Sequence, residues 1–219
     1  MLRDIADIYN RNLISIVMLS LILVIPVTYF IYSAISYLSL LDTVELNNVI
    51  AILLIIANFT VLFPPFLYIA LNELNDTSIK FIDLVKVFPS KFGFTAFLTL
   101  LFFLIAVFGS VLFFIPSIIA CMFILILPLF SDEDSIRKAL KKVWRVIKSE
   151  HIFILIDLLI IVSFNLLVWS SLLYLLSSFE NNNLVYITIR VLVNAVVFPL
   201  IYFYLAIKYR RDMGEEYGN

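Results

Sequence analysis

Residues 131–151, SDEDSIRKALKKVWRVIKSEH, carry the densest charge in a chain that is otherwise almost entirely apolar. At about 100° per residue, a helix from Ile136 gathers its aliphatic side chains and Trp144 on one face. Ser131 is the expected cap of its first turn. The opposite face is basic and consists of Arg137, Lys138, Lys141, Lys142, Arg145 and Lys148. This pattern is typical of a helix on an anionic membrane surface, although its apolar face can also pack on neighbouring protein.

Composition identifies a polytopic membrane protein. The 219 residues are 63% hydrophobic and 14% charged, whereas a soluble domain is nearer half apolar and a quarter charged. Long apolar runs predict six spanning helices, at about 13–35, 49–71, two within 92–130, 152–176 and 184–207. The turn between the third and fourth spans has two candidate positions, Gly109–Ser110 and a fourth span starting at Pro116. The predicted fold class is all-α, with six transmembrane helices and amphipathic helices on the cytoplasmic surface.

The basic residues predict the orientation. All Lys and Arg residues except Arg190 lie in the N-terminal segment, the loop 72–91, the basic helix or the C-terminal end. The turns 36–48 and 177–183, at the other ends of the spans, contain none. Because basic segments stay in the cytoplasm, both termini are predicted to be cytoplasmic in a multi-pass protein of the cell membrane.

The chain reads as one membrane domain, 1–208, followed by a cytoplasmic tail, 209–219. Within it, three units at 1–72, 73–130 and 131–208 each show a surface helix, a span, a short outer turn and a proline-broken span. The segments VLFPPFLYIA (61–70) and VVFPLIYFYLA (196–206) are alike. Internal duplication explains this pattern, and so does shared hydropathy. The units have parallel orientation, which argues against an inverted transporter repeat.

Three segments resemble a bacterial six-span family that includes the membrane domain found beside glycerophosphoryl diester phosphodiesterases. They are IADIYNRNLISIVMLSLILVIP near the N-terminus, the central IPSIIACMFILILPLFSDEDSIRKALKKVWRVIKSEHIFIL and the closing YFYLAIKYRRDMGEE. The resemblance implies a bacterial cell membrane and six spans. It implies no catalytic residues, because catalysis in the two-domain members would belong to a separate soluble domain.

Five polar residues within the predicted spans form a candidate intramembrane site: Asn58, Asp157, Asn165, Arg190 and Asn194. At 1.5 Å per residue, Asp157 lies about 9 Å from the inner boundary and Arg190 a similar distance from the outer one. We therefore expect no direct pair, with Asp157 meeting the basic helix or inner water. A proton or substrate relay would use these residues. Snorkelling and interhelical amide bonds, with Asn165 or Asn194 holding Arg190, are the interpretation that we favour.

Catalytic and cofactor motifs are absent from the sequence. It has no H-E-x-x-H, G-x-S-x-G or P-loop, and one histidine with one cysteine makes no zinc set. We expect a non-enzymatic membrane protein without cofactors, metal or nucleic acid, acting as a scaffold, accessory or protective (immunity-like) factor. Its expected partners are anionic lipids and a membrane protein. The alternative is a transporter or permease-type subunit for a small molecule, lipid or peptide. A cavity reaching Asn58 and Asn194 would favour transport.

Overall fold

The fold is all-α, as predicted. A computed structural model describes residues 2–40, 44–75, 77, 80–111, 114–177 and 183–215. Its elements in chain order are α1 Leu2–Arg11, α2 Leu13–Leu19, the π-helix η1 Ser20–Val24, α3 Ile25–Leu38, α4 Val44–Leu74, α5 Phe81–Gly109, α6 Ile115–Ile126, the 3₁₀ helix η2 Leu127–Phe130, α7 Ile136–Leu176 and α8 Asn183–Glu215.

Five helical segments among the described residues are long and apolar enough to cross a membrane. They are Leu13–Leu38, Leu46–Leu74, Phe81–Gly109, Ile136–Leu176 and Asn183–Arg210. The sixth apolar segment, Ile115–Phe130, is shorter. Its α6 and η2 contribute 12 and 4 residues, which reach about 24 Å at 1.5 Å per residue, less than a ~30 Å hydrocarbon core.

The turn between α5 and α6 uses both predicted positions. α5 ends at Gly109, and α6 begins at Ile115 with Pro116 in its first turn. A Cβ on Gly109 would lie 2.9 Å from both the Cβ of Pro116 and the backbone N of Ser117, so only glycine allows the two helices to approach this closely. Ser117 also donates a hydrogen bond to the carbonyl of Ala106, which ties the helices together beside the turn.

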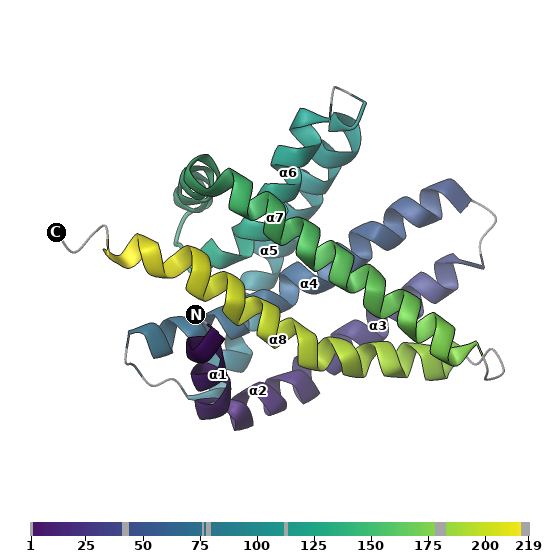
Figure 1. Cartoon of the computed structure of the whole chain (residues 1–219), viewed down its shortest axis with the longest axis horizontal. Coiled ribbons are helices and arrows are strands. Elements are labelled where there is room, and N and C mark those ends of the chain that lie inside the picture. The colour runs from purple at the N-terminus through teal and green to yellow at the C-terminus, as the bar shows by residue number, and fades with distance from the viewer. Residues whose placement is uncertain are drawn as a thin grey trace.

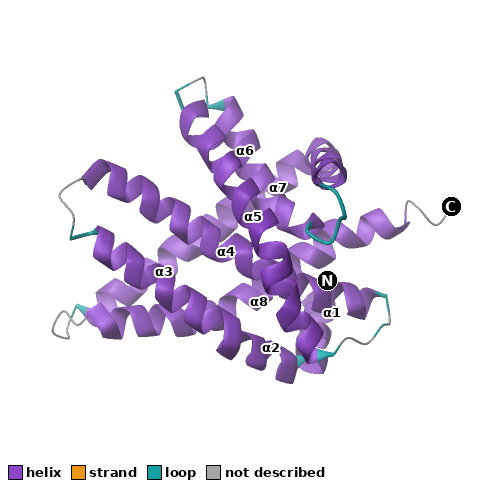
Figure 2. Cartoon of the chain, turned by 180° about the vertical axis from the view of Figure 1, so that it is seen from behind, coloured by secondary structure: helices purple, strands orange, loops and turns teal. Residues whose placement is uncertain are grey.

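The helices are arranged so that most segment ends gather at two sides of the molecule. Figure 1 shows at the left α1, the last turns of α4, the start of α7 and the end of α8. It shows at the right the end of α3, the start of α4, the end of α7 and the start of α8. The α5–α6 hairpin points upwards instead, and Figure 2 shows the same arrangement from behind. The basic segments predicted to share one side are thus at one side of the fold.

α7 combines the basic helix and the fifth span in one element, with a bend between them. Glu150 has non-helical backbone angles, φ −116° and ψ 19°. In Figure 1 the first part of α7 is seen nearly end-on, whereas the rest runs across the picture. The basic part therefore lies across the direction of its own span, which is the geometry a helix on the membrane surface needs.

Tyr202 on α8 is at the centre of the core. It is fully buried, and its ring centroid lies 4.5 Å from that of Phe63 and 5.0 Å from that of Phe59 on α4. Its hydroxyl donates to the Phe59 carbonyl at 2.7 Å. The two similar proline segments of the sequence thus meet, because Pro64 follows Phe63 and Pro199 precedes Tyr202 in the same contact.

The carbonyl that Pro199 frees has a partner on the first span. Pro199 has no N–H, so the carbonyl of Ala195, four residues earlier, loses its helical bond. Ser20 donates its hydroxyl to this carbonyl at 3.2 Å. Ser20 opens the π-helix η1, a widened turn just before Pro26, and π-turns often occur where a helix is interrupted. This proline is therefore accommodated by packing, with its free backbone group satisfied.

Candidate functional site

Arg190 on α8 lies at the centre of a buried polar cluster. It is 1% exposed. Its Nη2 donates to Asn165 Oδ1 on α7 at 2.7 Å, and its Nε donates to the Tyr32 hydroxyl on α3 at 3.0 Å. Its Cζ lies 4.0 Å from the ring centroid of Trp169. The prediction that Asn165 holds Arg190 is confirmed, while Tyr32 and Trp169 are partners that the sequence did not indicate.

Among the described residues, the positive charge of Arg190 has only neutral partners. The ion pairs found among the described residues do not include Arg190. Its neighbours are an amide oxygen, a hydroxyl and two aromatic rings, since Tyr32 lies 5.6 Å from its Cζ in addition to Trp169. Cation–π contacts favour a desolvated guanidinium, but they leave its full charge in place.

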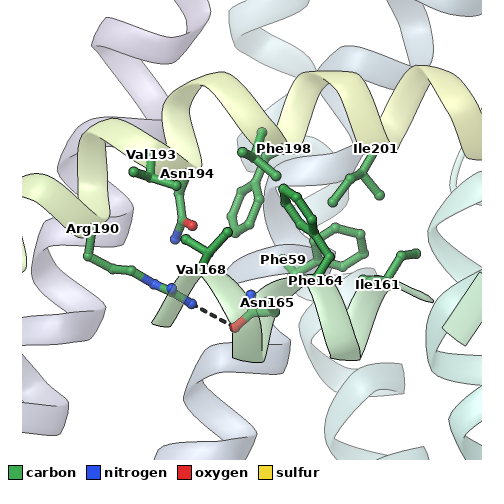
Figure 3. Close-up of a pocket in the computed structure, with 11 residues that line it drawn as sticks. Phe59, Ile161, Phe164, Asn165, Val168, Arg190, Val193, Asn194, Phe198 and Ile201 are labelled. Atoms are coloured by element: carbon green, nitrogen blue, oxygen red, sulfur yellow. Dashed lines mark hydrogen bonds between the residues drawn. The ribbon is translucent and has the colours of Figure 1, made fainter. Parts of the chain in front are cut away.

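A cavity opens beside Arg190, between α8, α7 and α4. Figure 3 shows Arg190 and Asn194 next to each other on α8, both directed towards α7. The cavity has a volume of about 30 Å³, and one water needs about 10–15 Å³ of such volume. Asn194 is 3% exposed, and its amide nitrogen, Nδ2, has no hydrogen-bond partner. The remaining wall is apolar and consists of Phe59, Ile161, Phe164, Val168, Val193, Val197, Phe198 and Ile201.

Asp157 on α7 is satisfied by α8 and not by the basic helix, which corrects our expectation. Lys208 Nζ donates to both carboxylate oxygens at 2.8 Å, the Tyr204 hydroxyl donates to Oδ1 at 2.7 Å and the Tyr209 hydroxyl donates to Oδ2 at 2.6 Å. The carboxylate is buried, with 2% of the side chain exposed. As predicted, Asp157 and Arg190 belong to separate clusters.

Asn58 on α4 lies outside the cavity. Its amide exchanges hydrogen bonds with the Thr28 hydroxyl on α3, at 3.2 and 3.3 Å, and both side chains are buried. Such amide bonds hold transmembrane helices together with about 0.6–2 kcal/mol each. Of the five residues predicted as one site, the structure therefore brings together Arg190, Asn165 and Asn194 and places Asn58 and Asp157 elsewhere.

The basic helix packs its apolar face on protein and turns its basic face outward. Ala139, Val143, Val146 and Ile147 are buried. Trp144 is half exposed and stacks on Phe123 of α6, with centroids 6.1 Å apart. The exposed basic residues are Arg137, Lys138, Lys141, Arg145 and Lys148, whereas Lys142 is partly buried in an ion pair with Glu133. Packing on protein is thus observed, and contact with lipid stays a prediction.

The acidic stretch before this helix binds the end of α8. Asp132 accepts a hydrogen bond from Arg210 at 2.7 Å, and Arg210 also lies over the Phe130 ring at 5.0 Å. The predicted cap by Ser131 is wrong, because the residue before α7 is Ser135 and it makes no side-chain cap bond. Ser131 is buried and its hydroxyl has no partner. The acidic residues therefore anchor α8 and Lys142 rather than the first turn of α7.

No protein family model, curated protein or solved structure matches the chain. The resemblance to the six-span family thus stays a prediction.

Proposed function

We propose that this chain is a non-enzymatic protein of a bacterial cell membrane, which crosses the bilayer six times and acts as a scaffold, accessory or protective factor. Five apolar helices of membrane length and a shorter sixth support the six crossings. The basic segments at one side of the fold support cytoplasmic termini. The resemblance to the membrane domain of the phosphodiesterase family is consistent with this proposal, since that domain carries no catalytic residues of its own.

The proposal rests mainly on the hydrogen bonds that the polar side chains within the spans make to neighbouring helices. Asp157 and Asn58 are buried and bonded to neighbouring helices. The polar cavity beside Arg190 reaches Asn194, and Asn58 is not among the residues that line it. Its size corresponds to two or three waters, which is too small for a route through the protein. A packed interior of this kind fits a protein that works through its surfaces.

Transport is the second candidate function, and the cavity at Arg190 is the observation in its favour. A protein with alternating access exposes the residues along its route to water from one side and then from the other. The packed core described above would then represent one closed state. Residues in this core would react with aqueous reagents whenever the protein opens, which provides a direct test.

Cysteine labelling in native membranes tests both proposals, in a Cys121→Ser background. Thr28→Cys and Thr60→Cys place a thiol of similar size at positions that are 0% exposed. We expect neither thiol to react with a permeant or an impermeant maleimide before denaturation, because both lie in packed protein. Reaction of either thiol in the folded protein would indicate a water route and favour transport.

The same experiment tests the orientation with exposed positions at the two sides. Two of the chosen residues are exposed just beyond the ends of α3 and α7, and they are replaced as Leu40→Cys and Ser177→Cys. Two more are exposed at the opposite side of the fold, and they are replaced as Lys86→Cys and Lys138→Cys. We expect an impermeant reagent added outside intact cells to label the first two and not the last two. External labelling at Lys138 would contradict cytoplasmic termini.

Anionic lipids are the proposed partners of the basic helix. Replacing Lys138, Lys141 and Lys148 by glutamine should loosen residues 136–148 on anionic nanodiscs, because each basic side chain contributes up to about 1 kcal/mol at such a surface. Hydrogen exchange of this segment should then quicken by at most about a hundredfold. Lys142→Gln is the matched control for losing one charge, since Lys142 is paired with Glu133. Equal protection of the unmodified protein on neutral and anionic discs would limit this helix to packing on protein.

A further inference from the structure

The charge of Arg190 calls for an anion. Arg190 is 1% exposed and so has little contact with bulk water, and burying a charge is unfavourable unless an opposite charge compensates it. The ion pairs of the described residues leave Arg190 out, unlike Lys208, which has Asp157. The contrast between these two cations on α8 is the first observation: the partly exposed Lys208 has a carboxylate partner, whereas the buried Arg190 has neutral partners among the described residues.

Asn194 supplies the second observation. It lies one helical turn after Arg190, so both side chains project from the same face of α8. Its Nδ2 is a buried donor without a partner, and Figure 3 shows the amide directed into the cavity beside the Arg190 side chain. Two donors that meet at one cavity, one of them charged, are complementary to an anionic acceptor.

The size and lining of the cavity define what fits. The cavity volume of about 30 Å³ has room for two or three small atoms. The two oxygens of a carboxylate, or the two free oxygens of a phosphodiester, are of this size. The rest of the wall is hydrocarbon, with Phe164 and Val168 of α7 and Val193 and Val197 of α8 among its residues. A polar end and an apolar wall suit an amphiphile better than a hydrated inorganic ion.

α7, which forms one side of the cavity, is largely exposed on its outer surface. In the most apolar 18-residue stretch of α7, only 11% of the residues are buried inside the protein, whereas 44% are buried in the corresponding stretch of α4. Leu159, Leu166 and Leu167, on the same helix as the cavity residues Phe164 and Val168, are exposed. Phe164 both lines the cavity and is 45% exposed, so the cavity wall includes a side chain that a lipid chain in the bilayer can contact.

We infer that Arg190 and Asn194 form a binding site for the acidic headgroup of an amphiphile, whose hydrocarbon chain lies against the apolar wall between α7 and α8. The anionic oxygens accept hydrogen bonds from the Arg190 guanidinium and from Asn194 Nδ2. Asn165 holds the guanidinium in position through its bond to Nη2. This site goes beyond the proposed function and does not depend on it.

Fluorescence of Trp169 provides the test, because its ring lies 4.0 Å from the Arg190 guanidinium carbon. The full chain carrying Trp144→Phe has Trp169 as its one tryptophan. It is placed in uncharged detergent and titrated with a long-chain carboxylate that carries bromine next to its headgroup. An alcohol with the same chain and bromine position is the neutral probe. We expect saturable quenching by the carboxylate and at least tenfold weaker quenching by the alcohol.

Asn194→Asp is the decisive variant. It places a carboxylate beside Arg190 and should abolish the preference for the carboxylate probe while keeping or raising the melting temperature, so that loss of binding is not loss of fold. Asn194→Leu should weaken carboxylate binding at least tenfold. Asn58→Leu removes an equally buried asparagine outside the cavity and should leave binding within about twofold of the unsubstituted protein.

Acetate and inorganic phosphate distinguish the two sources of an anionic group. We expect neither, at millimolar concentration, to displace the long-chain carboxylate. Displacement by either would assign the site to a free anion and overturn the amphiphile. Equal quenching by the alcohol and the carboxylate, or unchanged carboxylate preference in Asn194→Asp, would reject an anion site altogether. In that case Asn194 faces bound water alone.

Discussion

Asp157→Leu is expected to lower the free energy of unfolding by about 3 kcal/mol. The carboxylate accepts hydrogen bonds from Lys208, Tyr204 and Tyr209 at once, and leucine would leave a cation and two hydroxyls without their acceptor. Removing one partner of a buried ion pair costs about 3–5 kcal/mol. The lower figure applies because the Lys208 side chain is 23% exposed and can turn towards water. The measurement is reversible unfolding in mixed micelles at increasing SDS.

Two variants show whether the carboxylate itself is responsible. Asp157→Asn keeps one acceptor oxygen and loses the charge, so it should cost about half as much. Lys208→Met combined with Asp157→Leu removes both charges and should recover much of the loss, since replacing a whole buried pair by apolar groups is often close to neutral. A double variant as unstable as Asp157→Leu alone would assign the loss to shape rather than to the ion pair.

Tyr202→Ala is expected to destabilise the protein by about 3–5 kcal/mol. The ring is fully buried and contacts Phe59, Phe63, Phe66 and Phe198 at centroid distances between 4.5 and 5.7 Å. Within a bilayer the loss comes from packing contacts, because lipid is as apolar as the core. The same unfolding measurement applies.

The matched variants separate the ring from its hydroxyl and from its location. Tyr202→Phe loses only the bond to the Phe59 carbonyl and should cost about 1 kcal/mol. Phe97→Ala removes an aromatic ring that is 59% exposed on α5 and should cost well under 1 kcal/mol, since lipid fills the space. If Phe97→Ala and Tyr202→Ala were equally unstable, the core would not be centred on the α4–α8 contact.

The helices could be predicted from the sequence because hydropathy and helical periodicity are local properties. The apolar segments that form α4, α5 and α8 are long enough to be recognised as spans from composition alone. Gly109 and Pro116 were the two candidate positions of the turn before the short α6. The amphipathic pattern after Ile136 likewise predicted which face is buried. The sequence also separated the basic helix, 131–151, from the span 152–176, and the bend at Glu150 lies at this boundary. The angle of the bend could not be predicted, because it depends on how the helix packs.

The pairing of polar residues could be predicted only in part, because it depends on the rotation of one helix against another. Depth along the spans was enough to separate Asp157 from Arg190 and to place Asn165 near Arg190. Depth does not say which face of α8 meets α7, so Tyr204 and Lys208 were not foreseen as partners of Asp157. Their spacing of four residues, which puts both on one helical face, was the available signal.

The bonds at Asp157 also determine how the protein responds to membrane thickness. Three side chains of α8 hold one carboxylate of α7, so sliding these helices past each other by one turn, about 5.4 Å, would break all three bonds together. A helix whose apolar length exceeds the thickness of the bilayer commonly responds by tilting. The bond from Arg190 to Asn165 joins the same two helices at a second depth, so we expect α7 and α8 to tilt together in a thinner bilayer.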